Sequence, residues 1–306
     1  MSVVVLGSIN MDLTTYVPRL PGPGETLFGS RFITVPGGKG FNQAVAAGRL
    51  GTATHFVGRV GEDAFGRGVM DLIADEPVDI SGILIDPHSS TGLAVISVDE
   101  QAENSIIVIS GANMAHDAQE VARCRAALRQ AKVLLLQLES PLDVSLAAAQ
   151  AARETGAWVI LDPAPAKPLP AKAYRLCHML TPNEVEAEIL VGFRPTNREE
   201  AAQAAAILCE RGVETAVIKL GAQGVYYQSG SERGFVEPFS VKAIDTVAAG
   251  DAFNGGLAVA LAEERPLAEA IRWGAAAGAL ATTKAGASSA MPTRAELGML
   301  IKIDWR

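Results

Sequence analysis

Short apolar runs alternate along the chain with longer segments of helical period, and this alternation restricts the fold more than any other feature. The runs occupy residues 3–6, 133–137, 158–161 and 216–219. Strands that are apolar throughout are typical of a parallel sheet covered on both faces. Ala-, Leu- and Glu-rich segments at residues 117–131, 141–155, 197–211 and 267–285 have the period of helices. The order predicts a three-layer α/β/α sandwich with a mainly parallel central sheet and right-handed crossovers.

Two other segments, at about residues 12–35 and 91–110, alternate polar and apolar residues. This pattern is typical of antiparallel strands with one exposed face. We expect the two segments to form a small sheet that projects from the main body. Such a sheet would serve as a lid, or would pair with another subunit through its apolar face.

Composition excludes several classes of partner. The net charge is −8, whereas proteins that bind nucleic acid usually carry a basic face. No run of Lys and Arg indicates a membrane surface, and no stretch of about 18 apolar residues indicates a transmembrane helix. The first residues lack the pattern of a signal peptide, and the three cysteines are widely spaced. We therefore expect a cytoplasmic protein with reduced thiols and small-molecule ligands.

The stretch from residue 243 to 256 carries the clearest chemical signal. A turn of small residues, Ala248-Ala249-Gly250, leads into Asp251 and then into an apolar helix. The free amides at a helix start bind anions, so a carboxylate there is unfavourable unless it accepts a proton from a substrate. The arrangement favours phosphoryl transfer to a hydroxyl, with Asp251 as the base. The alternative is an ordinary helix start, where Asp is common.

A glycine-rich turn at residues 36–40 is the second candidate. Glycines there let the backbone approach a ligand closely, and Lys39 and Asn42 add hydrogen-bonding groups to a helix expected to begin near Asn42. Gly40 follows Lys39 where a P-loop requires Ser or Thr, so the turn is not a P-loop. A glycine turn before a core helix remains the alternative.

Polar residues also follow several of the expected strands. Asn10 and Asp12 come after the first strand, where ligands of α/β sheets bind, and Glu139 follows another. The single glycine there, Gly7, disfavours a dinucleotide site and hence a dehydrogenase. Each residue also has an ordinary explanation, because Asn and Asp commonly end strands.

Two further strand ends complete the set. Asn183 and Glu186 lie three residues apart at a helix start, so they share a face, and the carboxylate would hold a water bound to Mg²⁺. A capped acidic helix start is the alternative. The turn at residues 219–224 suits a flat base or a phosphate. Taken together, strand ends with compatible chemistry indicate one binding site.

At these motifs the sequence resembles the ribokinase family of carbohydrate kinases, over almost the whole chain. The motifs occur in order: Gly7-Ser-Ile-Asn-Met-Asp12, Gly37-Gly-Lys-Gly-Phe-Asn-Gln43, Gln137-Leu-Glu-Ser140, Pro182-Asn-Glu-Val-Glu186 and Asp245-Thr-Val-Ala-Ala-Gly-Asp251. The resemblance implies that Asp251 is the catalytic base on the primary hydroxyl of a sugar. Ala248, Ala249 and Gly250 would form the anion hole. The sugar would be held by Asn10, Asp12, Gly38, Lys39, Asn42, Glu139 and Asp251.

The resemblance also implies ATP, Mg²⁺ and a monovalent cation, usually K⁺. The implied ATP-binding residues are Asn183, Lys219, Gly221, Gly224, Gly250 and Asn254, with Glu186 supporting Mg²⁺ through water. The implied K⁺ site is made by Asp245, Val247, Ala285, Ala287 and Ser289. The expected architecture is a single domain of residues 1–306 with a β lid through which two copies form a homodimer.

The implied activity is ATP-dependent phosphorylation of the O5 hydroxyl of D-ribose. Another pentose, 2-deoxyribose or a nucleoside remains open as acceptor, and a non-catalytic sugar or nucleotide sensor is the alternative of another class. Three residues depart from the family pattern. Phe41 stands where Ala is usual and would narrow the pocket or pack outward, Ala275 replaces a polar residue near the adenine, and Asp162 replaces Asn.

Overall fold

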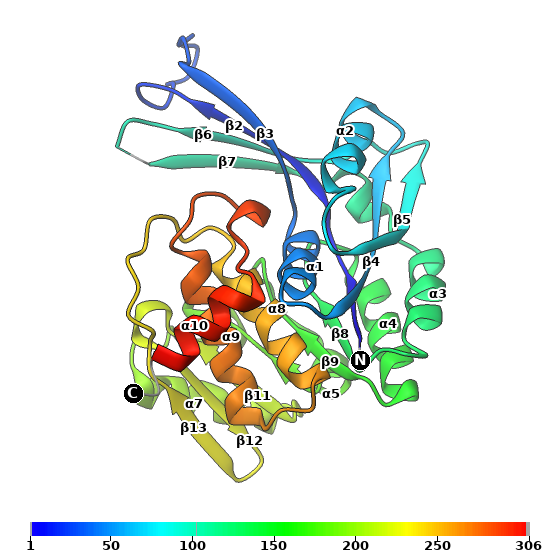
Figure 1. Cartoon of the computed structure of the whole chain (residues 1–306), viewed down its shortest axis with the longest axis vertical. Helices are drawn as coiled ribbons and strands as arrows, with labels where there is room; N and C mark the ends of the chain where they lie inside the picture. Colours follow the sequence, from blue (N-terminus) through cyan, green and yellow to red (C-terminus); the bar gives the residue numbers. More distant parts are fainter. Residues whose placement is uncertain (1, 102, 304–306) are drawn as a thin grey trace.

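The computed structural model describes residues 2–101 and 103–303. In this part of the chain, nine strands form a central sheet in the order β13-β12-β11-β10-β9-β8-β1-β4-β5 (Figure 1). The strands from β11 to β5 are parallel, whereas β12 and β13 pair antiparallel. The bounds are β1 Ser2–Leu6, β4 Ala53–Gly61, β5 Asp79–Asp86, β8 Val133–Leu136, β9 Trp158–Leu161, β10 Met179–Leu180, β11 Thr215–Lys219, β12 Val225–Ser229 and β13 Glu232–Val236.

Helices cover both faces of this sheet, which confirms the predicted three-layer sandwich. Two apolar clusters, one on each face, bury side chains of the same strands that point in opposite directions. No helix in residues 2–101 and 103–303 is long and apolar enough to cross a membrane. One face carries α1 Lys39–Arg49, α2 Ala64–Ile73, α8 Ala249–Ala262, α9 Leu267–Ala281 and α10 Arg294–Ile303; the other carries α3 Ala118–Ala127, α4 Leu142–Thr155, α5 Ala171–Leu176, α6 Glu184–Val191 and α7 Arg198–Glu210.

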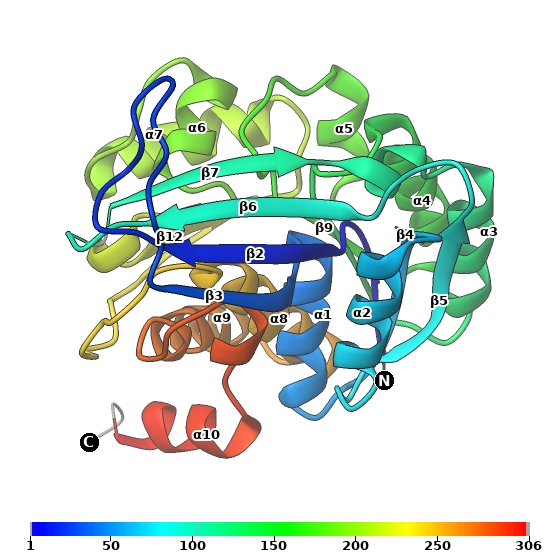
Figure 2. The same ribbon diagram turned by 90° about the horizontal axis from the view of Figure 1, so that it is seen from above.

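A second sheet of four strands extends from the main body, as expected from the alternating segments. Its order is β3-β2-β6-β7, with β2 Asn10–Tyr16, β3 Arg31–Gly37, β6 Gly92–Val98 and β7 Asn104–Ile109. Figure 2 shows these strands from above, lying across the body. The expectation of antiparallel strands is wrong at the centre, because β2 and β6 pair in parallel. Both β2 and β6 run outward from the main body, so these two neighbouring strands are parallel.

The predicted runs and helices coincide with β1, β8, β9, β11, α3, α4, α7 and α9 to within a few residues. One boundary difference affects chemistry. Helix α1 begins at Lys39 rather than near Asn42, so both residues lie in its first turn. Helix α9 ends at Ala281, four residues before the predicted end.

The order of the sheet fixes where a ligand binds. From β1 the chain adds β4 and β5 on one side and β8, β9, β10 and β11 on the other. A crevice forms at such a reversal, beyond the carboxyl ends of the strands, because the two connections leave in opposite directions. The residues that follow β1 and β8 therefore flank the expected binding crevice.

Phe41 packs into the core and not toward this crevice. Its side chain has no exposed surface, and its ring meets that of Phe56 edge to face at a centroid distance of 5.7 Å. Of the two orientations that the sequence left open, the one that narrows the pocket is wrong. The ring anchors α1, and through it the glycine-rich turn.

Replacing Phe41 by Leu should lower the free energy of unfolding by about 1–2 kcal/mol, because the edge-to-face contact and part of the core volume are lost. Urea denaturation measures the change. Phe28→Leu is the matched control, since Phe28 is 92% exposed and its replacement should change stability by less than about 0.5 kcal/mol. Equal stability of the two variants would contradict the placement of Phe41.

Candidate active site

Asp251 lies in the first turn of α8, at the carboxyl edge of the sheet. Its carboxylate is 4% exposed and accepts one hydrogen bond from Asn42 Nδ2 and one from Gln43 Nε2, each at 3.1 Å. Both donors come from α1, which packs against α8. The two helices therefore hold the carboxylate between them and fix the direction in which its oxygens point.

The amino end of α8 presents amides that a helix cannot satisfy internally. The residue before the helix, Ala248, has φ 58°, in the left-handed region that a residue with a Cβ rarely adopts. This strained turn directs the chain into α8 with Gly250 and Asp251 in its first turn. The predicted anion hole and the predicted base thus share one turn of backbone.

Burial raises the pKa of Asp251 to about 6, against a smaller opposing effect of Lys39. Burial lowers the pKa of Lys39, but Asp251, Asp162 and Glu139 outweigh it, so the lysine stays charged. A carboxyl whose pKa is near 6 is a better proton acceptor at neutral pH than an ordinary Asp, and it is still ionised there.

The glycine-rich turn lies directly on the end of β1. A Cβ on Gly40 would lie 2.6 Å from the Cα of Gly7, so only glycine permits this approach. Glu139, after β8, accepts a hydrogen bond from the backbone amide of Lys39 at 3.1 Å and another from Ser8 Oγ. The structure therefore brings together the ends of β1 and β8 and the start of α1, as predicted.

Asn10 and Asp12 reach the same place from β2. Asn113 Nδ2 donates to Asn10 Oδ1 at 2.7 Å, which leaves the Asn10 amide nitrogen as the group for a ligand. Asp12 Oδ1 is buried without a hydrogen-bond partner among the described residues. Burial and the nearby Glu139 raise the pKa of Asp12 to about 7. An orphaned carboxyl oxygen at this position fits a ligand that brings hydroxyl groups.

The predicted nucleotide residues lie at the ends of β10 and β11. Asn183 caps α6 and bridges to Lys219, the last residue of β11. Glu186 accepts from Asn183 N at 2.8 Å and from Asn183 Nδ2 at 3.0 Å, so its carboxylate completes a capping box. Burial raises the pKa of Glu186, and Lys219 opposes that rise. No group of three or more His, Cys, Asp or Glu that could hold a metal occurs among the described residues.

Beyond Lys219 the chain makes the expected turn. Gly221 and Gly224 have φ 53° and 109°, which glycine adopts without strain. Asn254 lies beneath this surface: its side chain has no exposed area, accepts from Thr181 Oγ1 at 2.8 Å and donates to the Gly250 carbonyl at 3.1 Å. The structure thus places Asn254 as a support for α8 and not on the surface of the site.

The predicted cation residues are also brought together. Asp245 accepts from Val247 N and from Gly286 N, each at 3.0 Å. These bonds tie the segment before α8 to the loop that contains Ala285, Ala287 and Ser289. The backbone carbonyls of the loop from Ala285 to Ser289 are therefore held near the segment that precedes α8.

Ala275, on α9, is partly buried against the core.

Three side chains that carry the network had no predicted role: Gln43 and Gln137 stood in quoted motifs, and Asp162 was noted only as a departure from the family pattern. Gln43 Nε2 donates to Asp162 as well as to Asp251, and Gln137 Nε2 donates to Gln43 Oε1 at 2.7 Å. Asp162 Oδ1 binds Lys219 Nζ at 3.0 Å. Gln43 falls one helical turn after Lys39, and that spacing was the available signal. Asn113 lay in no quoted motif.

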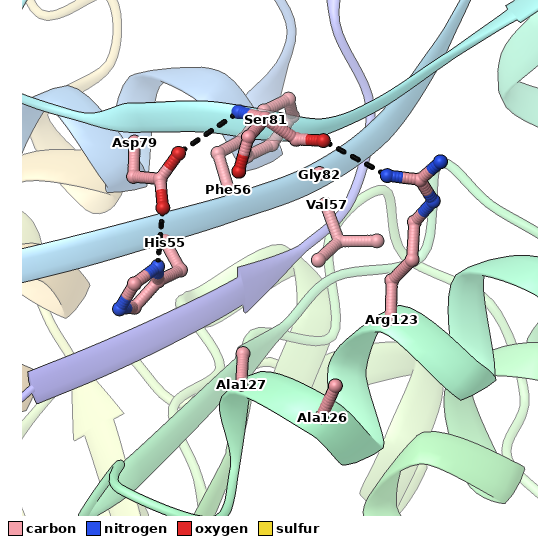
Figure 3. A pocket seen from close by; sticks show the side chains of 9 residues that line it. All are labelled: His55, Phe56, Val57, Asp79, Ser81, Gly82, Arg123, Ala126 and Ala127. Atoms are coloured by element: carbon pink, nitrogen blue, oxygen red, sulfur yellow. Dashed lines mark hydrogen bonds and ion pairs between the residues drawn. The ribbon is translucent and has the colours of Figure 1, made fainter.

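A pocket of about 240 Å³ lies elsewhere, between β4, β5 and α3 (Figure 3). His55 and Asp79 on its wall pair at 2.8 Å and stand near the starts of their strands. Parallel strands start at the edge opposite to their carboxyl ends, so this pocket is separate from the crevice. None of the predicted site residues lines it.

Comparisons with known proteins match the chain over nearly its whole length. The model of the pfkB family of carbohydrate kinases matches residues 1–294. The chain is 44% identical to the ribokinase of Haemophilus influenzae over 295 residues, covering 96% of each chain. It is 36% identical to the ribokinase of Staphylococcus aureus, covering 97% of this chain and 99% of that protein.

Solved structures match equally well. The Arabidopsis thaliana ribokinase complexed with ribose and ATP has a TM-score of 0.91 at 33% identity, with 98% of each chain covered. The Thermotoga maritima ribokinase has a TM-score of 0.90 at 34% identity, with 99% of each covered. These similarities extend across both sheets of the fold.

Carbon-13 NMR of the side-chain carboxyls should show Asp251 titrating near pH 6 and Asp12 near pH 7, because burial disfavours the charged form of each. Asp86 is the internal control, since hydrogen bonds from His88 and Ser89 and the charge of Arg59 hold its pKa below the ordinary value. Asp251→Asn and Asp12→Asn assign the signals. Titration of Asp251 and Asp12 near pH 4 would contradict the burial of the site.

Proposed function

The chain belongs to the pfkB family of carbohydrate kinases, and on this basis we propose that it transfers the γ-phosphate of ATP to the O5 hydroxyl of D-ribose, giving ribose 5-phosphate. The observation that carries this proposal is the place of Asp251. It is a buried carboxylate with a raised pKa at an amide-lined helix start, held by Asn42 and Gln43 of α1.

The sugar would lie between β2, the start of α1 and the end of β8. Asn10, Asp12 and Glu139 present amide and carboxylate groups to hydroxyls, and Lys39 and Asn42 close the same space. The ribokinases of Haemophilus influenzae and Staphylococcus aureus are 44% and 36% identical to the chain, and the Arabidopsis thaliana ribokinase, 33% identical, was solved with ribose and ATP. Since Phe41 is buried, it does not obstruct a pentose.

Asp251 would take the proton of the acceptor hydroxyl. The hydroxyl oxygen would attack the γ-phosphorus, and ADP would leave. The predicted anion hole at Ala248, Ala249 and Gly250 would stabilise the charge that develops on the transferred group. Phosphoryl transfer depends mostly on positioning and electrostatics, so the rigid junction of α1 and α8 is suited to it.

ATP would lie over the turn at Gly221 and Gly224, with its phosphates directed toward α8. Mg²⁺ commonly binds through one or two carboxylates, waters and substrate phosphates, and the buried carboxylate of Glu186 fits that demand. When bound, Mg²⁺ would neutralise phosphate charge. Asn183 would keep Glu186 oriented through the capping box.

A monovalent cation, K⁺, would bind between Asp245 and the loop from Ala285 to Ser289. Carbonyl oxygens are suitable ligands for K⁺, and the bonds from Asp245 already join the two backbone segments. Such a cation would act on catalysis through the backbone that leads from Val247 into the anion hole.

We further propose that the chain is a single domain in which the second sheet acts as a lid over the sugar and pairs two copies into a homodimer. Lid closure would exclude water, which competes as acceptor. The edge strand β7 is exposed throughout and carries a run of four aliphatic residues, Ile106 to Ile109. The enzyme would work in the cytoplasm, where its free cysteines stay reduced.

A panel of sugars and nucleosides, assayed for ADP release with ATP in the presence and absence of K⁺, tests the activity. Ribose should be the best acceptor, K⁺ should stimulate turnover, and Asp251→Asn should lose at least about 100-fold in kcat while still binding the sugar. Preference for 2-deoxyribose or a nucleoside would show that ribose is not the acceptor. Nucleotide binding without ADP release on any acceptor would favour a sensor instead.

Replacing Ile107 by Lys should convert the dimer to monomers in light scattering, because a charge would have to be buried at the pairing surface. Ile85→Lys is a close control: Ile85 is 62% exposed on the edge strand of the central sheet, and Ile107 is 63% exposed. The proposal fails if the wild type is monomeric or if both variants remain dimers.

A further inference from the structure

Lys219 is the side chain at the site whose surroundings the proposed function does not account for. Its side chain is 12% exposed, and its ammonium group pairs with Asp162 at 3.0 Å. Burial lowers the pKa of Lys219, but Asp162 and Glu186 outweigh it and raise the pKa above its ordinary value. The structure thus keeps a charged ammonium group in a largely buried place.

The position of this ammonium group is specific. Lys219 Nζ lies 3.4 Å from the point that a Cβ on Gly250 would occupy, so it stands against the first turn of α8. It also lies 5.8 Å from the centre of the Phe253 ring on the same helix. The amino end of a helix carries partial positive charge, which disfavours a cation and favours an anion. A lysine belongs there if an anion is to bind between it and the amides.

Asp162 supplies the negative charge that pairs with Lys219. One of its oxygens binds Lys219 Nζ, and the other accepts from Gln43 Nε2 at 3.0 Å, the amide that also binds Asp251. Isolated buried ion pairs contribute little to stability, because desolvation offsets their attraction. Stability alone is therefore a weak reason for this pair, and its location against the anion hole supplies a stronger one.

We propose that Lys219 is a catalytic residue whose ammonium group binds the non-bridging oxygens of the phosphoryl group during transfer, and that Asp162 is the positioning residue that holds it there beforehand. This inference rests on the proposed kinase function. It assigns the lysine side chain a role beyond the nucleotide-binding turn that its backbone begins. The phosphoryl group in transfer would then meet amides of α8 on one side and an ammonium group on the other.

Four variants test the role of Lys219: Lys219→Met, Asp162→Asn, the double variant D162N/K219M, and Lys132→Met. Lys219→Met alone leaves Asp162 buried without its cation and risks unfolding, so the decisive comparison is D162N/K219M with D162N. Removing a group that stabilises developing charge costs about 100-fold in kcat, and we expect that loss between these two. Lys132→Met is the matched control, because Lys132 also pairs with a carboxylate at 3.0 Å but lies on the exposed surface.

An equilibrium measurement separates catalysis from structure. ADP with aluminium fluoride mimics the phosphoryl group in transfer, and its affinity in the presence of sugar should fall at least tenfold from D162N to D162N/K219M, while that of ADP alone changes less than about threefold. A merely structural lysine would affect both ligands alike. The proposal is overturned if D162N/K219M turns over within about threefold of D162N, or if both ligands weaken equally.

The same assays keep this inference apart from the proposed function. Turnover of ribose by the wild type and by Lys132→Met reports on the function itself. The ratio between D162N/K219M and D162N reports on Lys219 and is measured with whichever acceptor the wild type uses best.

Discussion

The buried carboxylate of Asp251 is the interaction on which the rest of the site depends. A carboxylate that is 4% exposed is costly to ionise, and here the compensation comes from two side-chain amides of α1 and from the charge of Lys39. Both helices must therefore meet closely at this point, which requires small residues at their contact. A Cβ on Gly255 would lie 2.5 Å from the Cβ of Ala46, so α8 approaches α1 as closely as glycine allows. The apolar, small-residue character of the two helices is the packing condition for a carboxylate held between them.

Much of the fold follows from periodicity, because burial on both faces leaves a continuous apolar run that is visible in sequence. The strands β1, β8, β9 and β11 and the helices α3, α4, α7 and α9 were predicted for this reason. The candidate site was predictable to the extent that its residues end strands or start helices, as Asn10, Glu139 and Asp251 do. The family resemblance added their roles.

Contacts between residues far apart in the sequence could not be predicted in this way. The bonds of Gln43 with Asp162 and Asp251 join α1 to the ends of β9 and the start of α8, over more than a hundred positions. The orientation of Phe41 depended on where the helix begins: with Lys39 as the first residue Phe41 lies in the first turn of α1, whereas a start near Asn42 leaves Phe41 outside the helix. The parallel pairing of β2 with β6 likewise depends on where each strand leaves the body, which alternation does not encode.

The second sheet is joined to the body at the end where the candidate site residues lie. Asn10, the first residue of β2, pairs with Gly37 in β3 and Gly92 in β6, so the strands converge where the site residues lie. At the other end of the sheet, β2 and β3 are joined by a mostly exposed segment, residues 18–30. Insertions, deletions or substitutions in the outer half of the sheet can therefore leave the candidate site residues unchanged. The four strands therefore have an inner part that carries candidate site residues and an outer part that does not.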